Sequence, residues 1–380
     1  MIWIAGALFV VAMLMCLELI WGMNQLARLE SLPPRESRGA PRVTIVVAAR
    51  DEAVKIEAAV RSMLAQQYPA YEIVVVDDRS TDGTGDILDR LAAEESRLVP
   101  VHVKELPPGW LGKTHAMQLG ADRASGEWIL FTDADIHMHP ETISRAIRYA
   151  EEHRVDHLVS TPSLELPGAL LKGFGILFLF SFALFSKPWK ARDPKSWFFV
   201  GVGAFNMVRR TAYQGVGGHR RISLRPDDDM KLGKILKRAG YRQDLVDGVG
   251  MLRVEWYHSL REMVRAFEKN MFAGVEYSVL LSVVGGLAQL ASGVGPVIAV
   301  FFTSGVAQLL FAAQIGLCLI AFGFSATRIR VSPVAALMYP IATCLFAFIL
   351  WRTMLLNLTQ GGLQWRGTFY PLKLLKANRV

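Results

Sequence analysis

Cysteine is scarce in this sequence. The three cysteines, Cys16, Cys318 and Cys344, all lie inside apolar stretches of the 380-residue chain. No C-x-x-C pair and no zinc-ligand spacing occurs, which excludes a disulfide framework and a structural zinc site. We interpret these thiols as packing residues, and their small number is consistent with a reducing, cytoplasmic environment.

Charged side chains are also missing from both ends of the chain. Glu18 is the only one in residues 1–23, and none occurs in residues 277–327 or 331–351. About 20 apolar residues suffice for a helix to cross a ~30 Å hydrocarbon core. The two ends are therefore predicted to span a membrane. A transporter or channel would need paired intramembrane charges, which this sequence does not offer.

Four spans are expected, one before and three after the charged middle of the chain. The first is interpreted as an uncleaved anchor, because no A-x-A-like cleavage site follows it. The next two are expected to be separated by a turn near residues 293–296 or 304–305. The predicted parts are a transmembrane anchor at 1–24, a soluble domain at 41–273, transmembrane helices at 277–353 and a short tail at 354–380.

Basic residues near the span ends predict the orientation. Arg28, Arg35, Arg38 and Arg42 follow the first span, and they place the middle region in the cytoplasm. The tail is basic as well, although three spans after a cytoplasmic domain would leave it outside. Either one apolar stretch is re-entrant or the tail departs from the rule. The expected location is the cell membrane, with several spans and the middle region in the cytoplasm.

The middle region alternates between strand and helix patterns. A β-branched run at residues 43–48 suits a buried strand, residues 73–76, 97–103 and 128–132 are interpreted as further strands, and helical periodicity lies between them. This alternation predicts an α/β fold with a mostly parallel sheet and helices on both faces. Ligands bind such sheets outside the carboxyl ends of the strands. Because Arg50-Asp-Glu follows the first strand in place of G-x-G-x-x-G, a dinucleotide-dependent oxidoreductase is not expected.

Acidic residues close two of these strands. Asp77 and Asp78 end one of them, and Asp133 and Asp135 end another, on the same side of it. Two carboxylates so placed can approach one divalent cation, or a nucleotide with its metal. His137 and His139 follow in a loop, either as further ligands or simply as solvated side chains.

A third acidic group opens a later helix. Asp227, Asp228 and Asp229 precede the apolar positions of that helix. The helix dipole explains one acid there, but mutual repulsion of three would raise the pKa of one and suit it to act as a general base. Lys113, expected in the loop before a helix start, is either a phosphate contact or a solvated lysine.

Five motifs follow one another along the chain, namely Ala48-Ala-Arg-Asp-Glu-Ala, Val75-Val-Asp-Asp-Arg-Ser-Thr-Asp-Gly-Thr, Gly112-Lys-Thr-His-Ala-Met, Ala124-Ser-Gly-Glu-Trp-Ile-Leu-Phe-Thr-Asp-Ala-Asp and Asp228-Asp229. In this order, they resemble family 2 of the inverting glycosyltransferases. The similarity is greatest to membrane-anchored members that glycosylate lipids, such as ceramide glucosyltransferases and the hopanoid- and carotenoid-associated enzymes. It covers about residues 42–273, and Trp365-Arg-Gly-Thr-Phe-Tyr in the tail is also similar to that membrane group.

The resemblance implies a GT-A fold, which is a Rossmann-like, mostly parallel catalytic domain, joined here to transmembrane helices. It also implies a nucleotide-sugar donor (a UDP-sugar in the first place), Mg²⁺ or Mn²⁺, and a membrane lipid acceptor; no nucleic acid is expected. Asp228 stands where the family has Glu, which leaves open which acid is catalytic. By position, Arg50 and Glu52 would lie near the nucleoside, Asp77 and Asp78 at the base and ribose, Lys113 at the diphosphate, Asp133 and Asp135 at the donor and metal, and Asp229 would be the base.

One motif counts against a processive polysaccharide synthase, the alternative within the same family, as does the small number of expected spans. The Gln-x-x-Arg-Trp motif of processive members is absent, and Arg265 and Lys269 occupy the corresponding helix as phosphate contacts or as a basic face on anionic lipid.

Residues 168–186 are apolar apart from one lysine. A span there would place Asp229 on the wrong side, so an interfacial segment that admits a lipid acceptor is preferred over a buried helix pair.

Overall fold

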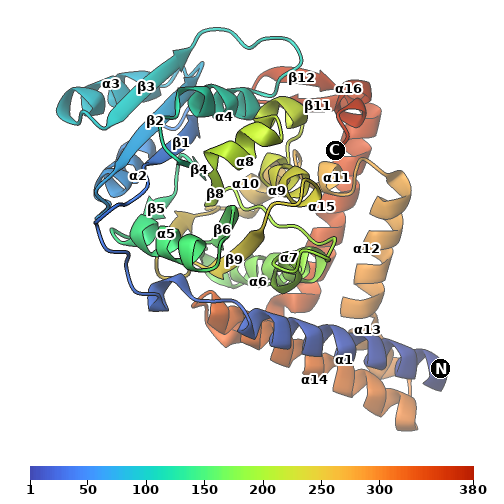
Figure 1. Cartoon of the computed structure of the whole chain (residues 1–380). Coiled ribbons are helices and arrows are strands. Elements are labelled where there is room, and N and C mark those ends of the chain that lie inside the picture. Colours follow the sequence, from blue (N-terminus) through green and yellow to red (C-terminus); the bar gives the residue numbers. More distant parts are fainter. The chain divides into compact units, whose positions relative to one another are not determined.

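The computed structural model describes residues 1–380 and divides them into two compact units (Figure 1). The helical unit comprises Met1–Gln25, Leu164–Lys187 and Glu255–Ala377. The sheet unit comprises Leu26–Ser163, Pro188–Val254 and Asn378–Val380. Whereas the sequence suggested one continuous domain at 41–273, the sheet unit is discontinuous, because the apolar helix within that range belongs to the helical unit.

The sheet unit is built on seven strands in the order β3-β2-β1-β4-β8-β6-β9. Neighbours among β1 to β4 pair in parallel, as do β6 and β9, whereas β8 is antiparallel to both β4 and β6. The predicted α/β class with a mostly parallel sheet is confirmed. The strands are β1 (Val43–Ala49), β2 (Tyr71–Asp78), β3 (Leu98–Val103), β4 (Trp128–Asp133), β6 (His157–Thr161), β8 (Asn206–Arg209) and β9 (Gln243–Asp247).

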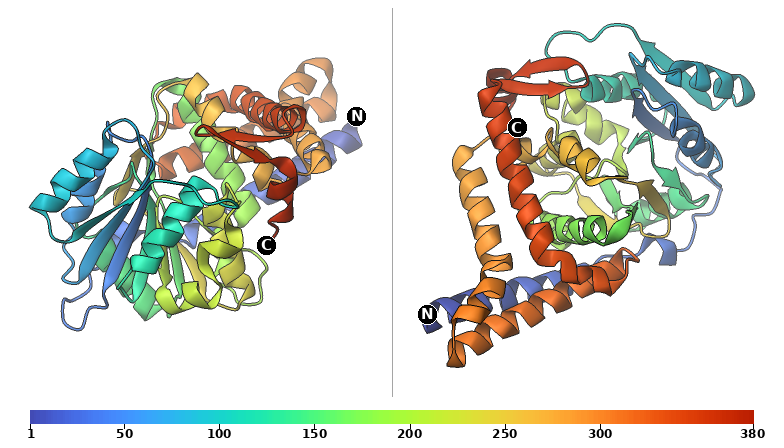
Figure 2. Two further views of the ribbon diagram at one scale, coloured as in Figure 1. Left: turned by 90° about the horizontal axis from the view of Figure 1, so that it is seen from above. Right: turned by 180° about the vertical axis from the view of Figure 1, so that it is seen from behind.

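Helices lie on both faces of this sheet (Figure 2). Val46, Met117, Ile129 and Leu232 belong to one buried apolar cluster, in which α4 and α9 meet the central strands. Two short strands, β5 (His137–Met138) and β10 (Leu252–Glu255), pair in an antiparallel manner. The helices are η1 (Leu29–Ser31), α2 (Ile56–Leu64), α3 (Thr84–Glu94), α4 (Gly112–Arg123), α5 (Thr142–Glu152), α7 (Pro188–Ala191), α8 (Arg210–Gly215), η2 (Gly218–Ile222) and α9 (Asp228–Arg238).

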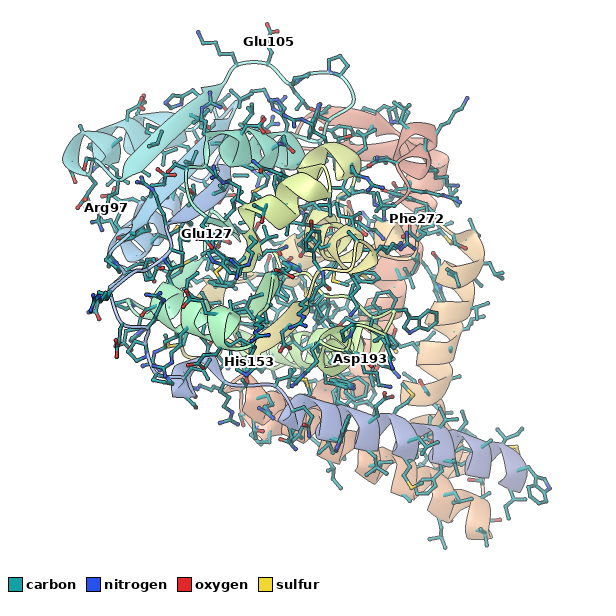
Figure 3. All side chains as sticks on the ribbon, viewed as in Figure 1. Arg97, Glu105, Glu127, His153, Asp193 and Phe272 are labelled. Atoms are coloured by element: carbon teal, nitrogen blue, oxygen red, sulfur yellow. The ribbon has the colours of Figure 1, made fainter.

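The strand register brings the acidic strand ends to one edge of the sheet. Ala48 of β1 pairs with Val76 of β2 and with Asp133 of β4, and Ala49 pairs with Asp77. The loop that leaves β3 extends from the same edge. In Figure 3, Glu105 marks this loop, and Arg97, which precedes β3, marks the opposite end of the strand. The strand ends that carry the candidate site therefore lie together, as parallel pairing requires.

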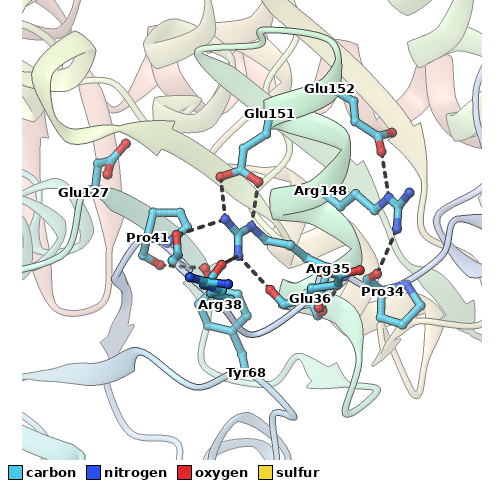
Figure 4. A network of polar contacts seen from close by, with 12 residues as sticks. Pro34, Arg35, Glu36, Arg38, Pro41, Tyr68, Glu127, Arg148, Glu151 and Glu152 are labelled. Carbon is cyan, nitrogen blue, oxygen red and sulfur yellow. Dashed lines mark hydrogen bonds and ion pairs between the residues drawn. The ribbon is translucent and has the colours of Figure 1, made fainter.

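The linker into the sheet unit is fastened to α5 by arginines (Figure 4). The Arg35 guanidinium lies 2.6 Å from the Glu151 carboxylate and also donates to carbonyl groups of its own turn. Arg148 pairs with Glu152 at 2.7 Å and donates to the Pro34 carbonyl at 3.2 Å. Arg35 was one of the residues used to predict orientation, and it also has this structural role.

The helical unit contains helices of membrane-spanning length. Four are long and apolar enough to cross a bilayer, namely Ile2–Asn24, Gly168–Ala191, Gly305–Arg328 and Pro333–Thr359. The elements of the unit are α1 (Ile2–Asn24), β7 (Ser163–Glu165) at its border, α6 (Gly168–Ser186), α10 (Leu260–Phe267), α11 (Met271–Gly274), α12 (Val279–Gly293), α13 (Gly295–Phe302), α14 (Gly305–Arg328), η3 (Pro333–Met338), α15 (Tyr339–Thr359), β11 (Gly362–Trp365), β12 (Thr368–Pro371) and α16 (Leu372–Ala377).

Three of these four helices, Ile2–Asn24, Gly305–Arg328 and Pro333–Thr359, are spans that the sequence suggested, and α6 is an additional one. The expected first span of residues 277–327 is a pair, α12 and α13, bent by 47° at the predicted turn near 293–296. The other expected turn, near 304–305, separates this pair from α14. Moreover, α6 is long and apolar enough to span, although an interfacial segment was preferred there.

Contacts within the helical unit orient α1 against α14. Ala5 packs with Ala307 near the start of both helices. Near the end of both, Arg328 donates to the Met23 carbonyl at 2.8 Å. The two helices therefore run parallel. Glu18, the single acid of α1, lies 2.7 Å from Lys187, so its charge is compensated.

Candidate active site

Lys113 connects the acids of two different elements. It lies in the first turn of α4, not in the preceding loop as expected, because the helix already begins at Gly112. Its Nζ is 2.7 Å from Asp133 Oδ1, at the end of β4, and 3.6 Å from Asp228 Oδ1, at the start of α9. Burial disfavours the charged amine, but Asp133, Asp228 and Asp229 outweigh it and raise the pKa of Lys113. The lysine therefore stays charged.

Asp135 and Asp133 form a pair of carboxylates that repel each other. Burial, followed by the charge of Asp133, raises the pKa of Asp135 to about 6, while Lys55 opposes the shift and Glu52 adds to it. A divalent cation would relieve this repulsion, and carboxylate oxygens are suitable ligands for Mg²⁺ or Mn²⁺. The donor set therefore fits a metal that takes its remaining ligands from phosphate and water.

The two histidines after Asp135 do not extend this pair into a larger metal site. No group of three or more His, Cys, Asp or Glu side chains that could hold a metal is formed. The His139 ring accepts a hydrogen bond from the Glu141 main chain at 3.3 Å. His137 lies in β5, paired with β10.

The three consecutive acids of α9 have three different environments. Asp227 accepts two hydrogen bonds from Arg225, at 2.9 and 3.0 Å, and lies 3.3 Å from Lys231. Arg225 is fully buried, so this pair is a structural anchor of the helix start. Asp228 is also buried and faces Lys113. Only Asp228 and Asp229 therefore face the charged cluster.

Asp229, the candidate base, is held by two main-chain N–H groups. Its Oδ2 accepts the Gly203 main-chain N–H at 2.8 Å, and its Oδ1 accepts its neighbour's N–H. Burial and then the charge of Asp228 raise the pKa of Asp229 to about 7, against the opposing effect of Lys113. A carboxylate with a pKa near neutrality can both accept and release a proton.

A glycine segment passes between the acids of β4 and α9. A Cβ on Gly203 would lie 2.7 Å from Asp133 Oδ2, and one on Gly201 would lie 2.0 Å from the Asp229 carbonyl oxygen. Neither position has room for a side chain. The absence of side chains at these glycines therefore lets the segment bring Asp133 and Asp229 close together.

Asp77 and Asp78 point to different sides of their strand. Asp77 accepts the Ser80 N–H at 3.2 Å and lies 3.3 Å from the His102 ring, on the β3 side. Asp78 pairs with Arg79 at 2.8 Å and lies 3.7 Å from Arg50. A Cβ on Gly112 would come within 2.0 Å of Asp78, so Asp78 lies against the start of α4.

The predicted residues therefore fall into two groups within the sheet unit. Lys113, Asp133, Asp228 and Asp229 form one cluster, with Asp135 and Glu52 beside it. Arg50 and Asp78 form the other, at the start of α4. Sequence reasoning missed the contacts of Gly203, Arg225 and His219. The run Gly215-Val-Gly-Gly before His219 is the one signal that the sequence offers, and such glycines indicate only a loop.

Comparison with known proteins decides the family. Residues 44–217 match the model described as "Glycosyl transferase family 2". These residues are a family 2 glycosyltransferase domain. The family resemblance seen in the motifs is thus confirmed, and the enzyme class of the domain is that of a glycosyltransferase.

Two curated relatives illustrate the range of this glycosyltransferase family. The chain is 24% identical to a 4,4'-diaponeurosporenoate glycosyltransferase of Staphylococcus haemolyticus over 250 residues, which cover 63% of this chain and 64% of that protein. It is 35% identical to the succinoglycan biosynthesis protein ExoO of Rhizobium meliloti over 111 residues, which cover 29% of this chain and 30% of that protein. The chain thus spans less than two thirds of either relative.

A solved structure supports the GT-A fold. A mannosyltransferase from Pyrobaculum calidifontis, solved in complex with GDP-Man and Mn²⁺, superposes with a TM-score of 0.58 at 21% identity, covering 90% of this chain and 98% of that one. The predicted GT-A class is confirmed. Asp228 and Asp229 lie beyond the residues matched by the family model, so their assignment rests on the geometry that joins them to Lys113 and Gly203.

Proposed function

We propose that the chain is an inverting glycosyltransferase that moves a sugar from a nucleotide-sugar donor to a hydroxyl or phosphate of a membrane lipid. The observation that carries this proposal is the position of Asp229, whose carboxylate accepts the Gly203 N–H in the cluster that Lys113 forms with Asp133 and Asp228, and whose pKa is raised by burial and by Asp228. A base facing a cation is the arrangement that a one-step displacement requires.

In this mechanism, Asp229 accepts the proton of the acceptor oxygen as that oxygen bonds to the anomeric carbon of the sugar. The bond between that carbon and the diphosphate breaks, and the diphosphate leaves with the electron pair. Lys113 stabilises the negative charge that develops on it. Asp133 and Asp135 would hold Mg²⁺ or Mn²⁺, which when bound supplies further positive charge to the diphosphate. Asp228 keeps Lys113 in place.

The nucleoside is assigned to the second group of residues. Arg50 and Asp78 lie together at the start of α4, beside the turn that carries Lys113. Both oxygens of Asp77 are engaged by Ser80 and His102, so Asp77 would shape the base site more than contact the ligand. Glu52 would lie near both the nucleoside and the metal, because its charge contributes to the raised pKa of Asp135. UDP-sugars are the first donors to test, and GDP-mannose is the second.

The lipid acceptor is supported by two observations. Four helices are long and apolar enough to cross a membrane, and one curated relative is named for transfer to a carotenoid acid. We assign residues 1–24 as an anchor, 41–273 as the region of the cytoplasmic catalytic domain with α6 as an interfacial segment within it, 277–353 as membrane helices and 354–380 as a tail. Nucleotide sugars of the cytoplasm would then reach the site.

The test is transfer by the purified full chain in detergent, with Mg²⁺ or Mn²⁺, a panel of nucleotide sugars and total membrane lipid. We expect metal-dependent release of nucleotide and one labelled lipid, and a loss of at least ~100-fold in Asp229→Asn. Asp86→Asn, an exposed acid of α3, is the matched control and should keep full activity. A ladder of water-soluble oligosaccharide would replace the proposal with the processive synthase. Full activity of Asp229→Asn would overturn the assignment of the base.

A further inference from the structure

His219 is a buried histidine that the mechanism above does not use. The residue is 1% exposed and lies in η2, directly after two glycines with positive φ. Its Nδ1 is 2.8 Å from the Tyr213 hydroxyl, and its main-chain N–H donates to the same hydroxyl at 3.0 Å. Its Nε2 is 3.9 Å from Asp228 Oδ2. The ring is therefore held at one end and directed at a candidate catalytic acid at the other.

The surroundings keep this imidazole neutral. Burial, reinforced by the charge of Lys113, lowers the pKa of His219 to about 3. The edge of the ring meets Phe131, with a centroid distance of 4.8 Å. A neutral imidazole has one N–H, so the nitrogen that carries it determines what Asp228 meets.

The hydrogen-bond network indicates which nitrogen carries the proton. The Tyr213 hydroxyl has one proton and two acceptors within reach, His219 Nδ1 at 2.8 Å and Gln118 Oε1 at 3.1 Å. Gln118 Oε1 already accepts the Arg220 main-chain N–H at 3.2 Å. With the proton directed to Nδ1, Nε2 carries the N–H and points its positive end at Asp228. The other tautomer would point a lone pair at a carboxylate, which is unfavourable.

We propose that His219 is a positioning residue for glycosyl transfer, whose neutral Nε2–H holds the Asp228 carboxylate against Lys113. This inference rests on the proposed function. At 3.9 Å, His219 Nε2 is too far from Asp228 Oδ2 for a hydrogen bond, so the N–H acts as a dipole directed at the carboxylate charge. Asp228 lies between this N–H and the Lys113 ammonium, at 3.6 Å from the latter. Asp228 then stays ionised and fixed, and Asp229 is left to accept the proton of the acceptor.

Two substitutions separate this role from simple packing. In His219→Gln the amide nitrogen can take the place of Nε2, whereas in His219→Asn it can reach only the place of Nδ1. We expect His219→Gln to keep kcat within ~3-fold of wild type and His219→Asn to lower kcat by ~10- to 100-fold, both with an unchanged KM for the donor. Because His219 acts through Asp228, adding His219→Asn to Asp228→Asn should cause little further loss.

A second measurement is independent of turnover. Nitrogen NMR of the full chain, labelled with ¹⁵N-histidine and held in detergent micelles at pH 7, should show a neutral Nε2–H tautomer that disappears in His219→Gln. An Nδ1–H tautomer would overturn the inference, as would equal losses of kcat in the Gln and Asn variants. A wild-type chain that transfers from no donor would overturn the proposed function and this role with it. An active wild type with a fully active His219→Asn would overturn only the role of His219.

Discussion

At the scale of single residues, the site is organised by charge. Lys113 carries its positive charge among Asp133, Asp228 and Asp229, and the pKa of Asp229 is raised as a result of burial and of the neighbouring Asp228. The sequence predicted an acid with a raised pKa in this run, since three adjacent carboxylates repel one another. It could not predict which of the three Arg225 neutralises, because that depends on the fold around the helix start.

This raised pKa predicts how the rate depends on pH. Asp229 accepts a proton only when ionised, and its pKa is about 7, so the ionised fraction grows as the pH rises from 6 to 8. We expect kcat/KM for the acceptor to rise about tenfold per pH unit below 7 and to level off above it. Asp228→Asn removes a charge that raises this pKa, so its profile should move to lower pH. A profile that is flat between pH 5 and 8 would contradict the role of Asp229.

At the scale of elements, strand ends and glycines position the site. The strands near residues 43–48, 73–76, 97–103 and 128–132 were predictable, because short apolar runs between helical repeats are typical of buried strands in a parallel sheet. The start of α4 was placed too late, since Gly112 is a weak helix former and Lys113 is not part of an apolar repeat. His219 was not predictable, because its contact with Tyr213 depends on how η2 folds back onto α8.

The segment that contains Gly203 provides a test at this scale. In Gly203→Ala, the new Cβ would approach Asp133 Oδ2 to 2.7 Å and would also disturb the N–H that Asp229 accepts. We expect kcat to fall by ~10-fold or more, because misplacing a reacting group by about 1 Å can cost ~100-fold. Gly316→Ala in α14, where a Cβ meets nothing within 4 Å, is the matched control. Equal activity of the two variants would show that the segment does not set the distance between the acids.

At the scale of the whole molecule, segments that follow one another along the chain do not always belong to the same compact unit. The apolar stretch 168–186 interrupts the sheet unit in sequence, yet α6 belongs to the helical unit. Composition predicted that the ends of the chain are apolar, but not which apolar helices pack together. The bend between α12 and α13 was likewise expected only as a turn, because glycine and proline mark a break without fixing its angle.

The ion pair of Glu18 and Lys187 joins α1 to the end of α6, two segments far apart in the sequence. In an apolar environment, removing one partner of an ion pair leaves the other charge less well compensated, which is more costly than removing both partners. Lys187→Gln and Glu18→Gln should therefore each lower the melting temperature of the full chain in detergent more than the double variant does. Melting temperatures that fall additively in the double variant would instead show that each side chain is stabilised by other partners, and that the pair does not fasten α1 to α6.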